Sequence, residues 1–407
     1  MKKKILIFSD CFIFGGCEIV LTNLVNSKLI NNDFEIIYSY RKFQEYDDKV
    51  NSKVDDKNLL LPIRLFSNDT YIYKLSLKKA AWYNTLLKYF LIFFSKIGIY
   101  QLLNFFILLR FFRKIKPDII FINNGGYPGS NLCRLAVFSA KFSNVDNILF
   151  NVNNLAFASK GFFDSQIDIL INKFVHTFIT ASEAAKKRLS EVRGFPLNKI
   201  LTFSNCVEEK QFQLNNSVLR DEFNIGNDVI IIGAVGLLTK RKGFSILLDS
   251  LKILIDKNSK ITISVFIIGE GEDRNLLEEK IIALGLKNYV NLIGFRSDVL
   301  NYVKDFDIFI LPSISNEDMP YVIVEAMMLK KPVIASRVAG TPEEVLDGET
   351  GIIVTPSSSK ELADAIYLLV NNIPLRLNYG LKGYERYHQY FRYDVIMKKY
   401  RDFFHSL

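Results

Sequence analysis

The chain has 407 residues, more than one hydrophobic core usually serves, so we expect two compact domains. Because 49% of the residues are hydrophobic, a disordered protein is excluded, and a mean hydropathy of +0.14 raises the question of membrane contact. The four cysteines form no Cys-x-x-Cys pair and have no histidine near them, which argues against a disulfide framework or a zinc site. The basic start runs into what resembles a first strand rather than a secretory signal, so we expect a cytoplasmic protein.

The net charge of +9 is concentrated in one segment, residues 70–117. This segment holds nine basic residues and no acidic one, and aromatic and aliphatic residues are densest there. Lys88, Lys96 and Arg110 interrupt its apolar runs before any reaches the roughly 20 residues that a membrane-spanning helix needs. Such a composition suits helices at the surface of an anionic membrane, although ordinary core helices with basic ends would share it. No nucleic-acid partner is expected, because no binding motif accompanies the charge.

Short apolar runs alternate with amphipathic stretches along most of the chain, a pattern typical of α/β proteins with parallel sheets covered by helices. In the first half we expect strands at residues 5–8, 34–38, 118–122, 148–152, 177–180 and 200–203. The helices expected between them include residues 18–30, the basic aromatic segment and residues 182–192.

A polar stretch at residues 207–228 interrupts the alternation, and we interpret it as a linker between a domain of residues 1–206 and one of residues 229–375. The second half predicts strands at residues 229–235, 262–268, 290–293, 308–311, 333–336 and 352–354. It also predicts helices at residues 273–284 and 321–329 and a final helical region at residues 360–404.

Two glutamates, Glu317 and Glu325, follow an expected strand that ends at Leu311. Pro320 suits the first turn of a helix, where its missing N–H costs nothing. The amides around residues 319–322 would then be donors at the C-terminal edge of a parallel sheet, which favours an anion. A diphosphate flanked by two polyols would satisfy the amides and both carboxylates, although acids beside a helix start often serve only as caps.

A second candidate phosphate site is the turn at residues 236–243, where Lys240, Arg241 and Lys242 are consecutive. Three cations at a strand-to-helix turn can neutralise a diphosphate, but a solvated surface turn can have the same composition. Other glycines follow expected strands, at the sheet edge where open α/β folds bind ligands; they include Gly15, Gly16, Gly269, Gly271, Gly294 and Gly340. The absence of Gly-x-Gly-x-x-Gly and P-loop motifs argues against a dinucleotide dehydrogenase or a P-loop NTPase.

In these motifs the chain resembles the retaining glycosyltransferases of family 4, which have the GT-B architecture of two facing Rossmann-like α/β domains with an interdomain cleft. The resemblance is almost continuous in the second half and looser in the first. The main matching residues are Gly15–Glu18, Gly236–Gly243, Gly269–Gly271, Gly294–Phe295, Leu311–Ser313, Glu317–Met327, Lys331–Ala335, Gly340–Glu343 and Gly348–Gly351.

This resemblance implies an enzyme that moves a sugar from a nucleotide sugar, with UDP or GDP as the nucleotide, to a lipid-linked or polysaccharide acceptor. The product would be a surface glycan such as lipopolysaccharide, capsule or exopolysaccharide. The first domain would bind the acceptor, the second would bind the donor, and residues 376–407 would cross back to the first domain. With the basic segment, this predicts a peripheral protein on the inner face of the cell membrane.

The resemblance also assigns roles to residues. Glu317, Arg241 and Lys242 would be catalytic, with Glu317 positioning the donor sugar and the cations binding the diphosphate. The donor-binding residues would be Gly15, Gly16, Lys242, Gly269, Gly294, Phe295, Met319, Pro320, Tyr321, Val322 and Glu325, the last on the ribose. We expect no metal and no cofactor, because fixed cations and amides can stabilise the leaving diphosphate.

Three residues depart from the family pattern. Leu237 stands where an arginine usually follows the glycine of the phosphate turn, Asn153 replaces a histidine common at the end of the fourth strand, and Cys206 replaces a glycine. Two alternatives therefore stay open. One is a weak or inactive protein that only binds a nucleotide sugar or a partner, and the other is a nucleotide-sugar epimerase, which would need catalytic acids and histidines that the sequence does not offer.

Overall fold

The computed structural model describes residues 2–11, 14–67, 98–159, 161–209, 217–258 and 261–407. Residues 70–97 of the basic aromatic segment and residues 210–216 of the expected linker lie outside these ranges. The chain divides into two compact units. The first comprises Met1–Thr180, Lys186–Phe203 and Met397–Leu407, and the second comprises Ala181–Ala185 and Ser204–Ile396.

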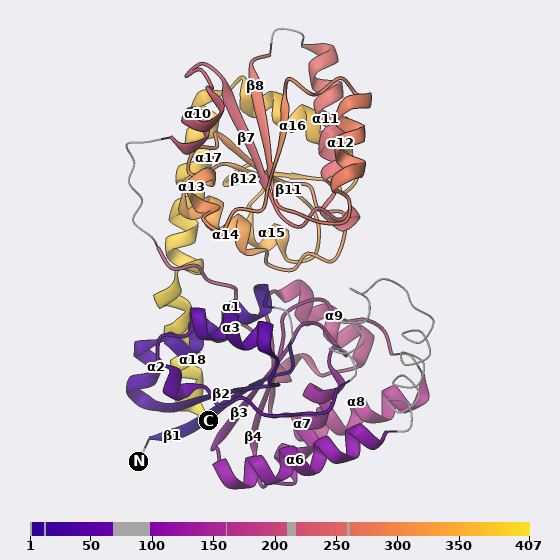
Figure 1. Ribbon diagram of the computed structural model, residues 1–407, viewed down its shortest axis with the longest axis vertical. Helices are drawn as coiled ribbons and strands as arrows, with labels where there is room; N and C mark the ends of the chain where they lie inside the picture. The colour runs from indigo at the N-terminus through magenta and orange to yellow at the C-terminus, as the bar shows by residue number, and fades with distance from the viewer. Residues whose placement is uncertain (1, 12–13, 68–97, 160, 210–216, 259–260) are drawn as a thin grey trace. The chain divides into compact units, whose positions relative to one another are not determined.

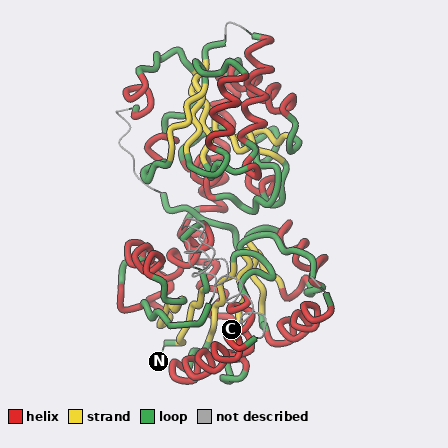
Figure 2. Tube along the Cα trace, turned by 45° about the vertical axis from the view of Figure 1, so that its right-hand side comes forward, coloured by secondary structure: helices red, strands yellow, loops and turns green. Residues whose placement is uncertain are grey.

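The first unit contains a six-stranded parallel sheet with the order β2-β1-β3-β4-β5-β6 (Figure 1). Its strands are β1 (Lys3–Ser9), β2 (Phe34–Tyr40), β3 (Ile119–Asn124), β4 (Asn147–Val152), β5 (Thr177–Thr180) and β6 (Ile200–Thr202). Helices cover such a sheet on both faces, so its strands are nearly continuous apolar runs, and every residue of β3 is buried. Figure 2 shows the strands between the helices.

In the first unit, helices α6 to α9 pack on one face of the sheet through a shared apolar core. The helices of this unit are α1 (Gly16–Asn26), α2 (Lys28–Asp33), α3 (Gln44–Lys53), α6 (Ile99–Ile115), α7 (Asn131–Lys141), α8 (Phe162–Phe174) and α9 (Glu183–Arg193). The single helix expected at residues 18–30 was wrong. Ser27 is extended and its hydroxyl accepts a hydrogen bond from the Ile30 amide at 3.4 Å, so α1 ends there and α2 begins.

The second unit contains another six-stranded parallel sheet, with the order β12-β11-β10-β7-β8-β9. Its strands are β7 (Ile230–Val235), β8 (Ile263–Ile268), β9 (Val290–Gly294), β10 (Ile308–Leu311), β11 (Val333–Ser336) and β12 (Gly351–Val354). Its helices are α10 (Val218–Phe223), α11 (Phe244–Lys257), α12 (Arg274–Ala283), α13 (Leu300–Val303), α14 (Tyr321–Met328), α15 (Thr341–Glu344), α16 (Ser359–Val370) and α17 (Ile373–Arg386).

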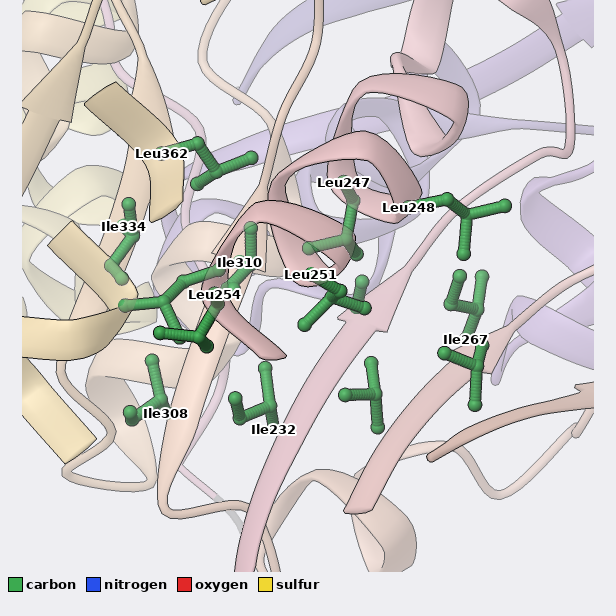
Figure 3. Packing of buried hydrophobic residues seen from close by; sticks show 14 of the residues in the cluster. Ile232, Leu247, Leu248, Leu251, Leu254, Ile267, Ile308, Ile310, Ile334 and Leu362 are labelled. Atoms are coloured by element: carbon green, nitrogen blue, oxygen red, sulfur yellow. The ribbon is translucent and has the colours of Figure 1, made fainter. Parts of the chain in front are cut away.

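One face of the second sheet is covered by an apolar core that α11 dominates (Figure 3). Leu247, Leu251 and Leu254 recur at helical spacing and are at most 2% exposed. They lie over isoleucines of β7, β8 and β10, as Figure 3 shows for Ile232 and Ile310. The packing of α11 fixes the turn that precedes it, residues 236–243.

The predicted α/β class with two parallel sheets is confirmed, and each expected strand is present within two residues of its expected ends. One helix of the second half was not predicted. Residues 218–223 of the polar stretch form α10, because Leu219 is fully buried in the core of the second unit. The predicted final helical region is confirmed, and it consists of α16, α17, a π-helical turn and α18 (Tyr393–Ser406), with Arg392 extended before α18.

No helix in the described ranges is long and apolar enough to cross a membrane. The helix α6 is the most apolar part of the basic segment that the structure describes, and its 17 residues include Arg110, Arg113 and Lys114.

Gly233 of β7 provides a test of this packing. A Cβ atom there would lie 1.9 Å from the ring of Phe306, which is 1% exposed, so Gly233→Ala should destabilise the second unit by about 1–3 kcal/mol or more. Chemical denaturation followed by circular dichroism measures the change. Gly383→Ala in α17 is the control, because its nearest neighbour would lie at 3.5 Å and alanine favours a helix. Equal midpoints for both variants would contradict the packing described here.

Candidate active site

Most of the predicted site residues lie in loops that follow strands of the second sheet, at its C-terminal edge. Backbone hydrogen bonds join these loops side by side. The Gly236 amide donates to Ile268 O and the Gly269 amide donates to Gly294 O, both at 3.0 Å. The Ile314 amide donates to Arg241 O at 2.9 Å, which ties the loop after β10 to the basic turn after β7. Residues far apart in the sequence thus form one surface of the second unit.

Two glycines allow these loops to approach so closely. Gly243 has φ of +69°, and a Cβ atom there would lie 2.0 Å from Pro312 O. Gly269 has φ of +149°, and its Cβ atom would lie 1.9 Å from Gly236 O. Any other residue would force the loops after β7, β8 and β10 apart, because both the backbone conformation and the space exclude a side chain.

Glu317 is the centre of the polar contacts at this edge. Its Oε2 atom accepts hydrogen bonds from Lys242 Nζ at 2.7 Å, Arg241 Nη1 at 2.9 Å and Ser313 Oγ at 2.9 Å. The side chains of Lys242 and Glu317 are only 10% and 9% exposed. The structure therefore brings together the three residues predicted to be catalytic, and it does so in a partly desolvated place where ion pairs are strong.

The charges in this cluster do not cancel. Arg241 and Lys242 carry two positive charges and Glu317 carries one negative charge, so the cluster keeps one positive charge. Lys242 has three N–H donors, and one of them donates a hydrogen bond to Glu317. An anionic ligand at this edge would find both uncompensated charge and available donors.

Ser313 belongs to this cluster and was not among the predicted site residues. Ser313 is 2% exposed. Its hydroxyl donates a hydrogen bond to Glu317, which helps to hold the carboxylate in place. A signal for it existed in the sequence. Ser313 is the first polar residue after β10, at the strand end where the site was expected.

The helix α14 begins beside the cluster, as the position of Pro320 predicted. Pro320 is its extended N-cap, and no side chain caps the helix. Met319 has φ of +48°, and its carbonyl accepts a hydrogen bond from Asn205 Nδ2 at 2.6 Å. The side chains of Met319 and Pro320 are buried, so these residues could contact a ligand mainly through the backbone. Glu325 lies on the half-buried side of α14.

Two buried acids near the cluster escaped the sequence analysis. Asp318 is 8% exposed and accepts a hydrogen bond from the hydroxyl of Ser182, which belongs to the second unit. Burial raises the pKa of Asp318 to about 7, and the carboxylates of Glu343 and Glu317 also raise it. Glu344 is fully buried and neither of its carboxylate oxygens has a hydrogen-bond partner within the described ranges. Burial, followed by the charges of Asp318, Glu317 and Glu343, raises the pKa of Glu344 well above its ordinary value.

These pKa shifts preserve the positive charge of the cluster. Protonation of Glu344 and partial protonation of Asp318 lower the negative charge beside the cluster at neutral pH. Sequence reasoning could not find this pair, because acidic residues after a strand or in a helix are usually solvated.

The raised pKa of Asp318 makes stability depend on pH. Between pH 4 and 7 the folded state holds a proton that the unfolded state has lost, so the stability contributed by protonated Asp318 is lost as pH rises to about 7. Asp318→Asn keeps an acceptor for Ser182 and removes the charge. We expect the variant to be about 1–3 kcal/mol more stable than the parent at pH 8, and the difference to vanish near pH 4. Thermal melts of both proteins across this range measure it; a difference that does not change with pH would contradict a raised pKa.

Three other predicted residues are described by their own surroundings. Phe295, after β9, is 70% exposed. Gly15 and Gly16 belong to the first unit, at the start of α1, where the Gly15 amide donates to Glu18 Oε2 at 2.8 Å and the Glu18 amide donates to Gly15 O at 3.1 Å. The glycine turn is thus fixed by the helix that it opens.

Two of the three residues that depart from the family pattern, Leu237 and Asn153, have definite surroundings. Leu237 is 62% exposed at the start of the basic turn. The side chain of Asn153 is fully engaged within the first unit, because its Nδ2 atom donates to Asn123 Oδ1 at 2.7 Å and Asn124 O at 2.8 Å. Its Oδ1 atom accepts from Asn151 Nδ2 at 2.9 Å.

Comparisons with known proteins find similar glycosyltransferases. The model of the family "Glycosyl transferases group 1" matches residues 215–386, which contain the whole cluster. The capsular polysaccharide biosynthesis glycosyltransferase CapM of Staphylococcus aureus is 29% identical over 309 residues, covering 74% of this chain and 79% of CapM. The phosphatidyl-myo-inositol mannosyltransferase of Mycobacterium leprae is 30% identical over 168 residues, 41% of this chain and 43% of the relative.

The fold has solved relatives. HepE of Anabaena, crystallised in complex with UDP, matches with a TM-score of 0.77 at 18% identity, covering 99% of this chain and 100% of HepE. Identity this low shows the fold alone, and it confirms the predicted GT-B class. The match to the family model identifies residues 215–386 as a segment similar to the group 1 glycosyl transferases.

Proposed function

We propose that this glycosyltransferase takes a sugar from a nucleotide sugar, with retention of anomeric configuration, and adds it to a lipid-linked or polysaccharide acceptor of a surface glycan. The observation that carries the proposal is the cluster of Arg241, Lys242 and Glu317, which keeps one net positive charge at the C-terminal edge of the second sheet. The uncapped start of α14 adds amide donors beside it.

The chemistry of the cluster suits the departure of a diphosphate. As the bond to the sugar breaks, negative charge develops on the leaving oxygen, and Lys242 and Arg241 are already held in place to stabilise it. Glu317 holds both cations and could accept a hydrogen bond from a sugar hydroxyl through its Oε1 atom. Glu325, further along α14, would accept a hydrogen bond from the ribose. The leaving phosphate would take the acceptor proton, so no protein base is assigned.

The names of the relatives favour a surface glycan. CapM acts in capsular polysaccharide biosynthesis, and the mannosyltransferase of M. leprae has an acceptor with a lipid anchor, phosphatidyl-myo-inositol. HepE was crystallised with UDP, which supports a uridine nucleotide donor as the first candidate here. A lipid-linked acceptor would also explain a peripheral position on the inner face of the cell membrane.

Replacement of Lys242 tests the proposed role of the cluster. Lys242→Met removes a charge that stabilises the leaving diphosphate, so we expect nucleotide release from the correct nucleotide sugar to fall about 100-fold or more. A panel of UDP and GDP sugars, with lipid extract as the acceptor, measures the release. The control Lys252→Met removes an exposed lysine of α11 that forms an ion pair with Asp256, and it should leave the rate unchanged.

Two outcomes would reject the proposed reaction. A parent protein that binds a donor but never releases nucleotide would support the alternative of an inactive binding protein. Conversion of the donor into its epimer without transfer would support the alternative of an epimerase.

The fixed cations also predict independence from divalent metals. Because Arg241 and Lys242 can balance the diphosphate, we expect EDTA to leave the transfer rate within about twofold of its value with Mg²⁺. Transfer that stops in EDTA and returns with Mg²⁺ would show that these cations do not suffice.

A further inference from the structure

The helix α6 exposes an apolar stripe that no other described element covers. Ile99, Leu102, Leu103 and Phe106 are 43%, 60%, 43% and 56% exposed. Their spacing places them on one side of the helix, opposite Asn104, Leu108 and Phe112, which are buried. The helix therefore packs on its sheet with one face and presents large apolar side chains to solvent with the other.

The same exposed side becomes basic toward the end of the helix. Arg110, Arg113, Lys114 and Lys116 are exposed, and none of them forms an ion pair within the described part of the chain. Two acids are near in sequence: Asp118 Oδ2 accepts a hydrogen bond from the backbone amide of Lys4 at 2.7 Å, and Asp146 Oδ1 lies 2.8 Å from Lys141 Nζ. Neither acid forms an ion pair with the four cations in the described ranges.

A hollow of about 510 Å³ lies at this basic end, between the end of α6 and the loop after α7. It is lined by Arg113, Lys116, Pro117, Ser143, Asn144 and Val145. Beside it Phe142 is 58% exposed; Arg113 Nη2 donates to Phe142 O at 3.2 Å, and the ring of Phe142 lies 5.8 Å from that of Phe105. Cations, a hydroxyl and an amide thus surround a space that adjoins exposed apolar groups.

We propose that α6 and the loop after α7 form a docking surface for an anionic lipid membrane, with the phosphate of a lipid headgroup in the hollow between Arg113 and Lys116. The proposal rests on the peripheral membrane position proposed above and names its surface. Leu102 and Phe106 enter the boundary between headgroups and acyl chains, while the cations meet the headgroups. A membrane is favoured over a protein partner because apolar groups and unpaired cations follow one another along a single helix side without any acid.

Sedimentation with vesicles tests the proposal. The full chain is mixed, without nucleotide sugar, with vesicles of phosphatidylcholine alone or with 30% phosphatidylglycerol. We expect partition onto the anionic vesicles only, and a decrease as salt rises. Arg113→Gln/Lys116→Gln should lower the partition coefficient about 30-fold, since each cation near an anionic surface contributes about fivefold. Leu102→Ser/Phe106→Ser should also lower it, but on its own should leave the salt dependence intact.

The matched control is Lys398→Gln/Lys399→Gln, which removes two exposed lysines from α18 and should change partition less than about threefold. If Lys398→Gln/Lys399→Gln lowered the partition coefficient as much as Arg113→Gln/Lys116→Gln, the proposed site would be overturned, because the attraction would then reflect net charge alone. Saturable binding of glycerol phosphate without vesicle binding would also overturn it, by indicating a soluble phosphate ligand. Circular dichroism melts confirm that each variant is folded.

The vesicle experiment is independent of catalysis. A protein that binds anionic vesicles through Arg113 and Lys116 but releases no nucleotide would disprove the proposed function and keep the docking surface. A protein that transfers sugar but does not bind vesicles would keep the proposed function and disprove the docking surface.

Discussion

The candidate site depends on a single carboxylate oxygen, Glu317 Oε2, which holds Lys242, Arg241 and Ser313 together. A lysine that is only 10% exposed would lose much of its hydration without compensation unless a partner of opposite charge lay next to it. Glu317 supplies that partner and leaves the cluster with a surplus of positive charge. The charge that could stabilise a leaving diphosphate is therefore in place before any ligand arrives, as an efficient electrostatic site requires.

The fold brings the partners of Glu317 Oε2 close enough to bind the same oxygen. Lys242 follows β7 and Glu317 follows β10, which are neighbours in the sheet although 75 residues separate the two side chains in sequence. The loops can approach because Gly243 tolerates Pro312 O at a distance that no side chain would permit. The core beneath α11 then holds the basic turn against the sheet, so the geometry of the site depends on the apolar packing of α11.

Much of this could be predicted from the sequence. Parallel strands are buried on both faces, so their apolar runs are conspicuous, and the polar groups that follow them mark the functional edge. That reasoning selected Arg241, Lys242 and Glu317, which the structure brings together. It missed the break at Ser27 and the helix α10, because a serine in an apolar helix and a polar stretch carry no clear signal until the side chains that they contact are known.

The buried acids show a deeper limit. Nothing in the sequence around Asp318 or Glu344 indicates burial, since their desolvation arises from segments that meet only in the folded unit. Leu237 shows a limit of another kind: the missing arginine is visible in the sequence, but only the structure indicates that two other cations already converge on one carboxylate.

The most direct measurement is calorimetric titration of UDP, GDP and the corresponding nucleosides into the parent protein and into Lys242→Met. If the cluster binds a diphosphate, the parent binds one of the nucleotides, and Lys242→Met weakens that binding at least about tenfold while the affinity for the nucleoside stays the same. Equal affinity of both proteins for the diphosphate would show that the cations held by Glu317 do not serve this ligand.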